Sequence, residues 1–222
     1  MVTPIKAYVF DVYGTLFDVH SVKEKCEELF PEKGESISLI WRKKQLEYFF
    51  MRQLMGDYED FQKITKDALG YTLEEHHEEW SSHIEQTLIS AYSHLTLYPE
   101  VVGVLKKLSK NKIAIFSNGT PDMLDSLITN AGLTPHFDRI ISVDEIKQYK
   151  PTPASYRYAL KQLGVAREEV LFISSNGWDI SGAKNFGFQT AWINRAKLPE
   201  EKFNLSPDRI YSDLNGITEW ND

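Results

Sequence analysis

The sequence lacks the features that mark secreted, membrane-spanning or nucleic-acid-binding proteins. Cys26 is the only cysteine among 222 residues, so no disulfide can form within the chain, and we expect a cytoplasmic location. Met1–Phe10 lacks the charged start and long apolar stretch of a signal peptide, and no apolar run approaches the ~20 residues that a membrane helix needs. Basic residues are also in deficit, with 25 Lys and Arg against 32 Asp and Glu, so we expect no nucleic-acid partner.

A dinucleotide-binding motif is missing too. No Gly-x-Gly-x-x-Gly follows the first predicted strand, which argues against a dehydrogenase with a dinucleotide cofactor. The hydrophobic content of 42% is nevertheless enough to bury a sizeable core, either as one domain with an insertion or as two small domains.

Short apolar runs alternate with amphipathic segments along much of the chain. Ile5–Phe10 predicts a buried first strand that runs into a turn at Asp11. Further strands are predicted at Lys112–Phe116, Ile140–Val143, Val170–Ile173 and Thr190–Ile193, and helices at Val101–Lys110, Pro121–Ala131, Pro153–Leu163 and Ile180–Phe186. This alternation predicts a parallel sheet joined by right-handed crossovers.

The stretch from Ser21 to His94 is different, because it is charged, aromatic and helical in its periodicity. Ser38–Met55 is its clearest amphipathic helix, and Glu59–Leu69 and Leu73–Ser90 are predicted as further helices. We therefore predict an α/β fold with a Rossmann-like parallel-sheet core, residues 1–17 and 96–222, interrupted by an all-helical cap subdomain, residues 18–95.

Polar side chains follow the ends of the predicted strands. Ligands of open α/β sheets bind outside the carboxyl ends of the strands, which makes seven residues candidates for one site: Asp11, Ser117, Asn118, Lys150, Ser174, Asn176 and Asp179. Asp11 alone also fits a turn cap, and Lys150 alone fits a solvated loop lysine. Together, a strand-end carboxylate, a hydroxyl–amide pair and a lysine make a nucleophile with charge partners.

Five stretches of sequence are distinctive. They are Phe10-Asp11-Val12-Tyr13-Gly14-Thr15-Leu16-Phe17-Asp18-Val19-His20-Ser21, Leu39-Ile40-Trp41-Arg42-Lys43-Lys44-Gln45-Leu46-Glu47-Tyr48, Ser117-Asn118-Gly119, Tyr149-Lys150-Pro151 and Ile173-Ser174-Ser175-Asn176-Gly177-Trp178-Asp179. With them, nearly the whole chain resembles the haloacid dehalogenase superfamily and, within it, the L-2-haloacid dehalogenases. The first and the last stretch separate this subfamily from the wider superfamily.

Two departures from the phosphatases of that superfamily favour the dehalogenases. The phosphatases carry a second acid two residues after the nucleophile, which protonates the leaving alcohol, and Tyr13 stands there in this chain. They also carry acidic magnesium ligands in the last motif, where this chain has Ser174-Ser175-Asn176 and one acid, Asp179. Because Mg²⁺ prefers carboxylate oxygens and halide leaves without a proton, we expect carbon–halogen hydrolysis with no metal and no cofactor.

The resemblance implies a role for each residue of the polar site. Asp11 would attack C2 of a short L-2-haloacid in line and form an ester, which gives a D-2-hydroxy acid after hydrolysis. Lys150 would keep Asp11 ionised and help to bind the substrate carboxylate. Asp179 would steer the water that cleaves the ester. Thr15 would orient Asp11, and Tyr156, Ser174 and Asn176 would complete the polar shell.

The resemblance also implies a substrate pocket that the cap helps to close. Ser117 and Asn118 would bind the substrate carboxylate, and Arg42 of the cap would reach the departing halide together with Asn118. Four further side chains would form an apolar slot for the alkyl chain: Tyr13, Leu46, Phe61 and Trp178. Relatives often carry a neutral amide in place of Lys43, which leaves the substrate size open.

Several residues also have a simpler structural interpretation. Without the resemblance, Arg42 fits a solvated helix arginine and Trp178 a core aromatic. His76, His77, His83 and His94 could suggest a metal cluster, but a solvated, charged helix face explains them. The apolar residues Phe49-Phe50-Met51 and Leu54-Met55 fit the interior of the cap or a dimer contact, and the family tends to form homodimers.

Two other functions compete with the dehalogenase. A small-molecule phosphatase of the same superfamily is the runner-up, and a generic aryl phosphate with Mg²⁺ would test it. A non-catalytic binding protein with the same fold would have lost its nucleophile or lysine, whereas Asp11 and Lys150 are both present.

Overall fold

The structure is a computed structural model that describes residues 3–221. Residues 1, 2 and 222 lie outside the described residues. The start of the predicted core segment 1–17 and the end of the segment 96–222 therefore lie outside them as well. Within residues 3–221, no helix is both long and apolar enough to cross a membrane.

A six-stranded parallel sheet forms the centre of the core. Its strand order is β5-β4-β1-β6-β7-β8, with the strands at Ala7–Phe10 (β1), Lys112–Ser117 (β4), Arg139–Ser142 (β5), Val170–Ser174 (β6), Gln189–Ile193 (β7) and Arg209–Tyr211 (β8). β1 lies between β4 and β6, with Phe10 paired to Ile115 and Ile173. The β1, β4 and β6 strands are apolar and almost wholly buried, as expected for central strands of a parallel sheet.

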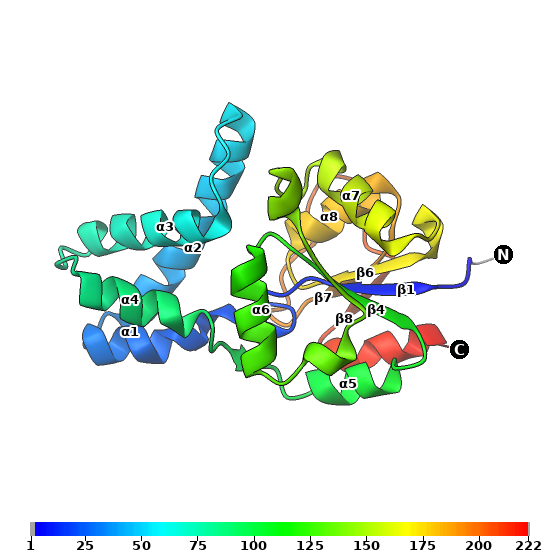
Figure 1. The fold of residues 1–222 in the computed structure, drawn as a ribbon, viewed down its shortest axis with the longest axis horizontal. Coiled ribbons are helices and arrows are strands. Elements are labelled where there is room, and N and C mark those ends of the chain that lie inside the picture. Colours follow the sequence, from blue (N-terminus) through cyan, green and yellow to red (C-terminus); the bar gives the residue numbers. More distant parts are fainter. Residues whose placement is uncertain (1–2, 222) are drawn as a thin grey trace.

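Helices cover both faces of this sheet. They are α5 (Val101–Lys107), α6 (Pro121–Asn130), α7 (Pro153–Leu163) and α8 (Gly177–Phe186). α7 and α8 lie above the sheet in Figure 1, and α5 lies below it together with the C-terminal 3₁₀ helix η5 (Leu214–Asn221). The α/β prediction is confirmed, and β8 is the strand of this sheet that it missed. β8 is three residues long and largely exposed, so it lacks the apolar run that marks the central strands.

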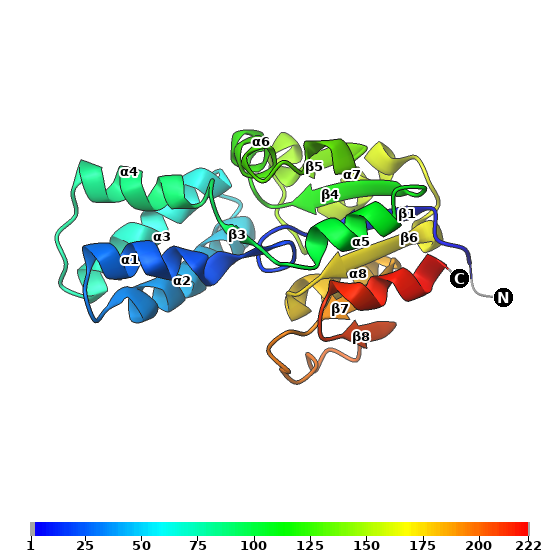
Figure 2. The same ribbon diagram turned by 90° about the horizontal axis from the view of Figure 1, so that it is seen from below.

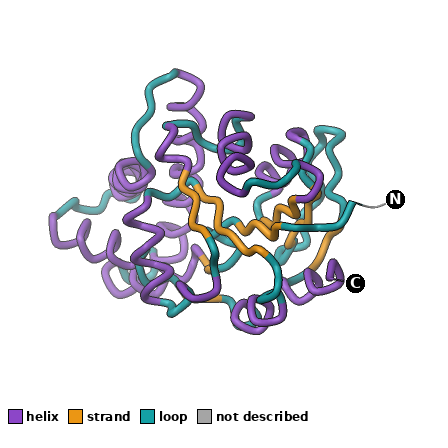
Figure 3. The backbone as a smooth tube through the Cα atoms, turned by 45° about the vertical axis from the view of Figure 1, so that its right-hand side comes forward, coloured by secondary structure: helices purple, strands orange, loops and turns teal. Residues whose placement is uncertain are grey.

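The helical insertion forms a separate group beside the core, and we call it the cap. It contains α1 (Lys23–Leu29), α2 (Gly34–Met55), α3 (Phe61–Glu75) and α4 (Ser82–Ala91), which lie apart from the sheet in two views (Figures 1 and 2). The chain enters and leaves the cap through β2 (Phe17–Asp18) and β3 (Thr96–Leu97), which pair antiparallel. Figure 3 shows this division between the strands of the core and the helices of the cap.

One helix prediction in the cap is wrong. Leu73–Ser90 is not continuous, because α3 ends at Glu75 and α4 begins at Ser82. His77 has a φ of +56°, which a helix interior does not allow. The Ser81 side chain accepts a hydrogen bond from Ile84 N at 3.2 Å, and this N-cap starts a new helix.

Candidate active site

Asp11 lies at the carboxyl end of the central strand, where its carboxylate is held from two sides. Its backbone N–H continues the sheet by donating to Ile173 O at 2.9 Å. Lys150 Nζ donates to Oδ1 at 2.9 Å. Three side chains approach Oδ2: Thr15 Oγ1 at 3.0 Å, Asn176 Nδ2 at 2.9 Å and Ser174 Oγ at 3.4 Å. These donors hold the carboxylate in one fixed orientation.

The turn after β1 makes this arrangement possible. Gly14 has a φ of +89°, and a Cβ there would lie 3.0 Å from Ser175 Oγ, so a side chain would be strained. The turn brings Thr15 back to Asp11. Thr15 Oγ1 accepts the backbone N–H of Ser175 at 2.9 Å, which leaves its proton for Asp11.

Lys150 is the charge centre of the site, and its side chain is only 1% exposed. Besides Asp11, its Nζ donates to Asp179 Oδ2 at 2.6 Å and to Phe116 O at 3.1 Å. Burial lowers the pKa of Lys150, but the two carboxylates outweigh burial, and the pKa lies above its ordinary value. An ammonium has three protons, and all three are used here. The geometry therefore does not support the predicted contact of Lys150 with a substrate carboxylate.

Asp179 lies behind Lys150, away from the cavity. It is fully buried, and its Oδ1 accepts the Tyr156 hydroxyl at 2.7 Å while Oδ2 faces Lys150. Burial raises the pKa of Asp179 to about 6, against the opposing effects of Lys150 and the Tyr156 hydrogen bond. Asp179 was predicted to steer a water in the cavity. This geometry does not support that role, because both carboxylate oxygens are engaged within the protein.

The loop after β4 offers free donors. Gly119 N donates to Ser117 Oγ at 3.1 Å, so the Ser117 hydroxyl proton remains available. Lys150 N donates to Asn118 Oδ1 at 2.9 Å, which fixes the orientation of this amide and leaves Nδ2 for a ligand. A hydroxyl and an amide N–H at one strand end suit an anionic ligand.

The cap supplies the opposite wall. Arg42 of α2 is partly buried and donates from NH1 to Gln45 Oε1 at 2.6 Å. Burial lowers the pKa of Arg42, and Asp11 is among the groups that oppose this shift. A guanidinium nevertheless stays charged in proteins. The site therefore places a carboxylate on the core opposite a cation on the cap.

The space between these two groups is small, and both apolar and polar side chains line it. The cavity is about 10 Å³ in volume, close to the ~10–15 Å³ that one water requires. Its lining residues are Asp11, Tyr13, Arg42, Leu46, Phe49, Phe61, Ser117, Asn118, Lys150, Asn176 and Trp178. The buried polar atoms Tyr13 OH and Trp178 Nε1 have no hydrogen-bond partner among the described residues. A haloacid can enter only if the cap or its side chains move.

The structure brings the predicted residues together in two shells. Ten of them line the cavity, while Thr15, Tyr156, Ser174 and Asp179 lie behind it and contact Asp11, Lys150 or one another. Phe49 lines the cavity but was predicted as cap interior or a dimer contact. Its position on the α2 face of Arg42 and Leu46, three or four residues apart, was the available signal.

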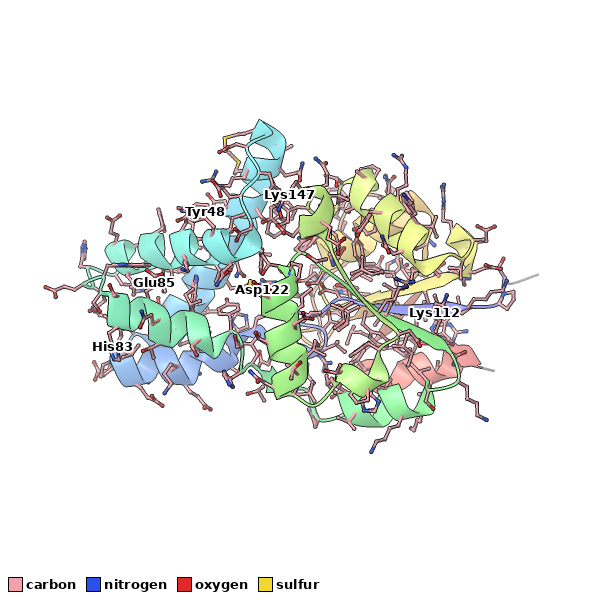
Figure 4. The ribbon with its side chains drawn as sticks, in the orientation of Figure 1. Tyr48, His83, Glu85, Lys112, Asp122 and Lys147 are labelled. Atoms are coloured by element: carbon pink, nitrogen blue, oxygen red, sulfur yellow. The ribbon has the colours of Figure 1, made fainter. Side chains whose placement is uncertain are left out.

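Within residues 3–221, no group of three or more His, Cys, Asp or Glu could hold a metal ion. The histidines of the cap do not form such a group, and His83 lies on the part of the cap far from the core (Figure 4).

Comparison with known proteins places this geometry in a family. Residues 5–187 match the sequence profile of the haloacid dehalogenase-like hydrolases. The chain belongs to this family. It is 43% identical to the (S)-2-haloacid dehalogenase of Pseudomonas sp. (strain YL), over 97% of this chain and 94% of that protein. It is 51% identical to the (S)-2-haloacid dehalogenase of Xanthobacter autotrophicus, over 89% of this chain and 77% of that protein.

A solved structure of this family is similar along almost its whole length. It is the L-2-haloacid dehalogenase from Xanthobacter autotrophicus with chloropropionic acid covalently bound. The TM-score is 0.93 at 42% identity, with 97% of each chain covered. This haloacid dehalogenase-like hydrolase therefore shares the fold of a solved relative over nearly its whole length.

Proposed function

We propose that this haloacid dehalogenase-like hydrolase is an (S)-2-haloacid dehalogenase, which converts short L-2-haloalkanoic acids into D-2-hydroxy acids and halide. The observation that carries the proposal is the pairing of a carboxylate fixed by Lys150 with the cation Arg42 across one small cavity. A nucleophile on one wall and an anion-stabilising group on the other are the two requirements of an in-line displacement of halide.

The reaction has two steps. An Asp11 carboxylate oxygen bonds to C2 of the substrate, and the carbon–halogen bond breaks with its electron pair going to the halide beside Arg42 and Asn118 Nδ2. Water then attacks the carbonyl carbon of the aspartyl ester, which releases the hydroxy acid, a proton and the free Asp11 carboxylate. C2 is inverted once, because the second step does not touch it.

The remaining lining residues would bind and orient the substrate. The Ser117 hydroxyl and the N–H groups of its loop would hold the substrate carboxylate. The apolar side chains would hold the alkyl group and exclude water during the first step: Tyr13, Leu46, Phe49, Phe61 and Trp178. Lys150 would hold Asp11 and Asp179 rather than the substrate, because its third proton goes to Phe116 O.

The phosphatase alternative is not supported. Tyr13 replaces the second acid that would protonate an alcohol leaving group, and burial raises the pKa of Tyr13 above its ordinary value. Asp179 is held by Lys150 and Tyr156 rather than left open for Mg²⁺.

We also propose the finer organisation of the molecule. Residues 18–95 form a cap that closes over a core of residues 1–17 and 96–222, and two chains associate through the C-terminal end of α2. In support of the second point, Met51, Leu54 and Met55 are exposed there, and this end of α2 projects beyond the other cap helices in Figure 1. A cytoplasmic location fits the single cysteine.

The test is halide release from L-2-chloropropionate, with chiral analysis of the lactate formed. We expect D-lactate from the L-substrate and little turnover of the D-substrate. Single-turnover reactions in ¹⁸O-water, with enzyme in excess, should give unlabelled lactate first, while the Asp11 peptide gains mass. Labelled lactate with an unlabelled Asp11 peptide would exclude the covalent route, and racemic or retained product would exclude a single inversion at C2.

A further inference from the structure

We propose that Gln45 is a positioning residue, which holds the Arg42 guanidinium in place without neutralising its charge. This inference rests on the proposed dehalogenase function. Gln45 lies one turn after Arg42 on α2 and has no exposed surface. It does not line the cavity, so it acts through Arg42.

The first step of the argument is what Arg42 contacts. Its NH1 donates to Gln45 Oε1 at 2.6 Å. Within residues 3–221, Gln45 is its hydrogen-bond partner and no carboxylate forms a salt bridge with it. Asp11 acts on Arg42 only as a charge across the cavity.

The second step is what holds Gln45. Its Nε2 donates to Thr65 Oγ1 of α3 at 2.7 Å, and the Thr65 hydroxyl donates to Phe61 O at 2.6 Å. Since the Thr65 proton is already used, Thr65 can only accept from Gln45, and the amide must turn its oxygen toward Arg42. The chain of hydrogen bonds therefore fixes the guanidinium against α3, the helix that begins with the cavity residue Phe61.

The third step is the chemistry of the partner. A carboxylate at this distance would form a charge-assisted pair with Arg42 and offset much of its positive charge. An amide oxygen fixes the same guanidinium with a dipole and leaves its full charge for an anion in the cavity. A departing halide gains negative charge in the transition state, so it needs a cation that is both fixed and uncompensated.

The test compares Gln45→Glu with wild type on 2-chloro- and 2-bromopropionate. Glutamate has the same shape but brings the offsetting charge. We expect kcat for the chloro acid to fall by about 30-fold or more, with KM changed less than about threefold. The fall should be smaller for the bromo acid, because the larger ion spreads its charge. The bromo-to-chloro ratio of kcat therefore rises, whereas a loss of folded enzyme lowers both rates equally.

Two further variants keep the test decisive if Gln45→Glu folds poorly. Thr65→Val removes the acceptor for Gln45 with little change of shape, and we expect a fall in kcat of about three- to tenfold with the same rise in the ratio. The matched control is Thr72→Val, also buried on α3, where Thr72 Oγ1 bonds to Ala68 O at 2.8 Å away from the site. It should leave kcat and the ratio unchanged.

A double-mutant cycle separates positioning from general structure. In an Arg42→Ala background, Gln45→Glu should have almost no further effect on kcat, since its effect passes through Arg42. An active wild type whose Gln45→Glu and Thr65→Val variants keep a normal kcat or an unchanged ratio would overturn this inference alone. A wild type that releases no halide would overturn the proposed function and, with it, this inference.

Discussion

Lys150 and Asp179 set the charge of the site at the scale of single residues. Lys150 faces two carboxylates with all of its protons used, so its positive charge is shared between Asp11 and Asp179. If Asp179 takes up a proton, Lys150 binds Asp11 alone and more tightly, and Asp11 becomes a weaker nucleophile. We therefore expect the protonation of Asp179, behind the cavity, to control how strong a nucleophile Asp11 is.

This sharing predicts a pH dependence. Burial raises the pKa of Asp179 to about 6, so Asp179 is ionised above that pH and protonated below it, and kcat should rise with pH around 6. The Tyr156 hydroxyl favours the ionised form, so Tyr156→Phe should move the midpoint of this limb upward by about one pH unit. The control is Tyr158→Phe on the same helix, whose hydroxyl bonds to Glu145. A limb that stays in place in Tyr156→Phe would contradict the role given to Asp179.

Phe49 should decide how long a substrate the cavity accepts. It lines the cavity with Leu46 and Trp178, so Phe49→Ala opens space at the place proposed for the alkyl chain. We expect kcat/KM for 2-chlorobutanoate, relative to 2-chloropropionate, to rise by about tenfold. Phe50→Ala is the matched control, since Phe50 packs on Trp178 from outside the cavity. An unchanged preference in Phe49→Ala would remove this residue from the substrate pocket.

At the scale of helices and strands, hydrogen bonds connect the cap to the core. The last turn of α2 and the segment between α2 and α3 reach the part of the core before α7. We call these contacts the latch, formed by Gln53, Tyr58, Asp144 and Tyr149. Tyr58 OH donates to Asp144 Oδ1 at 2.7 Å, and Tyr149 N donates to Gln53 Oε1 at 2.7 Å. Figure 4 shows the neighbouring Lys147 on the side of the core that faces α2. Because the cavity is small, we expect these contacts to loosen when substrate enters.

Weakening the latch should lower the affinity for substrate. Tyr58→Phe removes a hydrogen bond to a charged acceptor, worth about 1.5–3 kcal/mol, but keeps the stacking of the ring on Tyr149 at 4.9 Å. The closed state is then less populated, and we expect KM to rise by about three- to tenfold while kcat does not fall. Steady-state kinetics against a Tyr48→Phe control, on the outer side of the cap, would show it. A variant with wild-type KM would mean that the latch does not limit closure.

At the scale of the whole molecule, we predict that turnover needs no metal. The positive charge that faces Asp11 comes from Lys150 and Arg42, which would do the work of a cation. We expect halide release to continue unchanged after exhaustive treatment with EDTA. Loss of turnover that Mg²⁺ restores would contradict this prediction.

The proposed association of two chains is tested by mass in solution. Leu54 is 83% exposed and Met55 63%, and burial of these side chains against a second copy would stabilise a dimer. We expect wild type to sediment as a dimer and Leu54→Glu as a monomer or a weaker dimer. Leu198→Glu, on an exposed loop of the core, serves as the control. A monomeric wild type at micromolar concentration would exclude the proposal.

The sequence by itself determined the class of fold and the candidates for the site. Apolar runs such as Val170–Ile173 predict central strands because a strand covered on both faces must be apolar throughout. Strand ends such as Asp11 and Ser117 could be identified as ligand positions because parallel strands all end at one edge. Local signals of this kind need no knowledge of distant contacts.

Only the tertiary structure decided which atoms meet. Lys150 lies 139 residues from Asp11 along the chain, and nothing local tells that its third proton goes to Phe116 O and leaves none for substrate. The position of Phe49 in the cavity was missed for a similar reason. An aromatic on an amphipathic helix can face a core or a cavity, and the choice depends on how the cap sits on the core. That position is set by long-range packing, which the local pattern of residues does not contain.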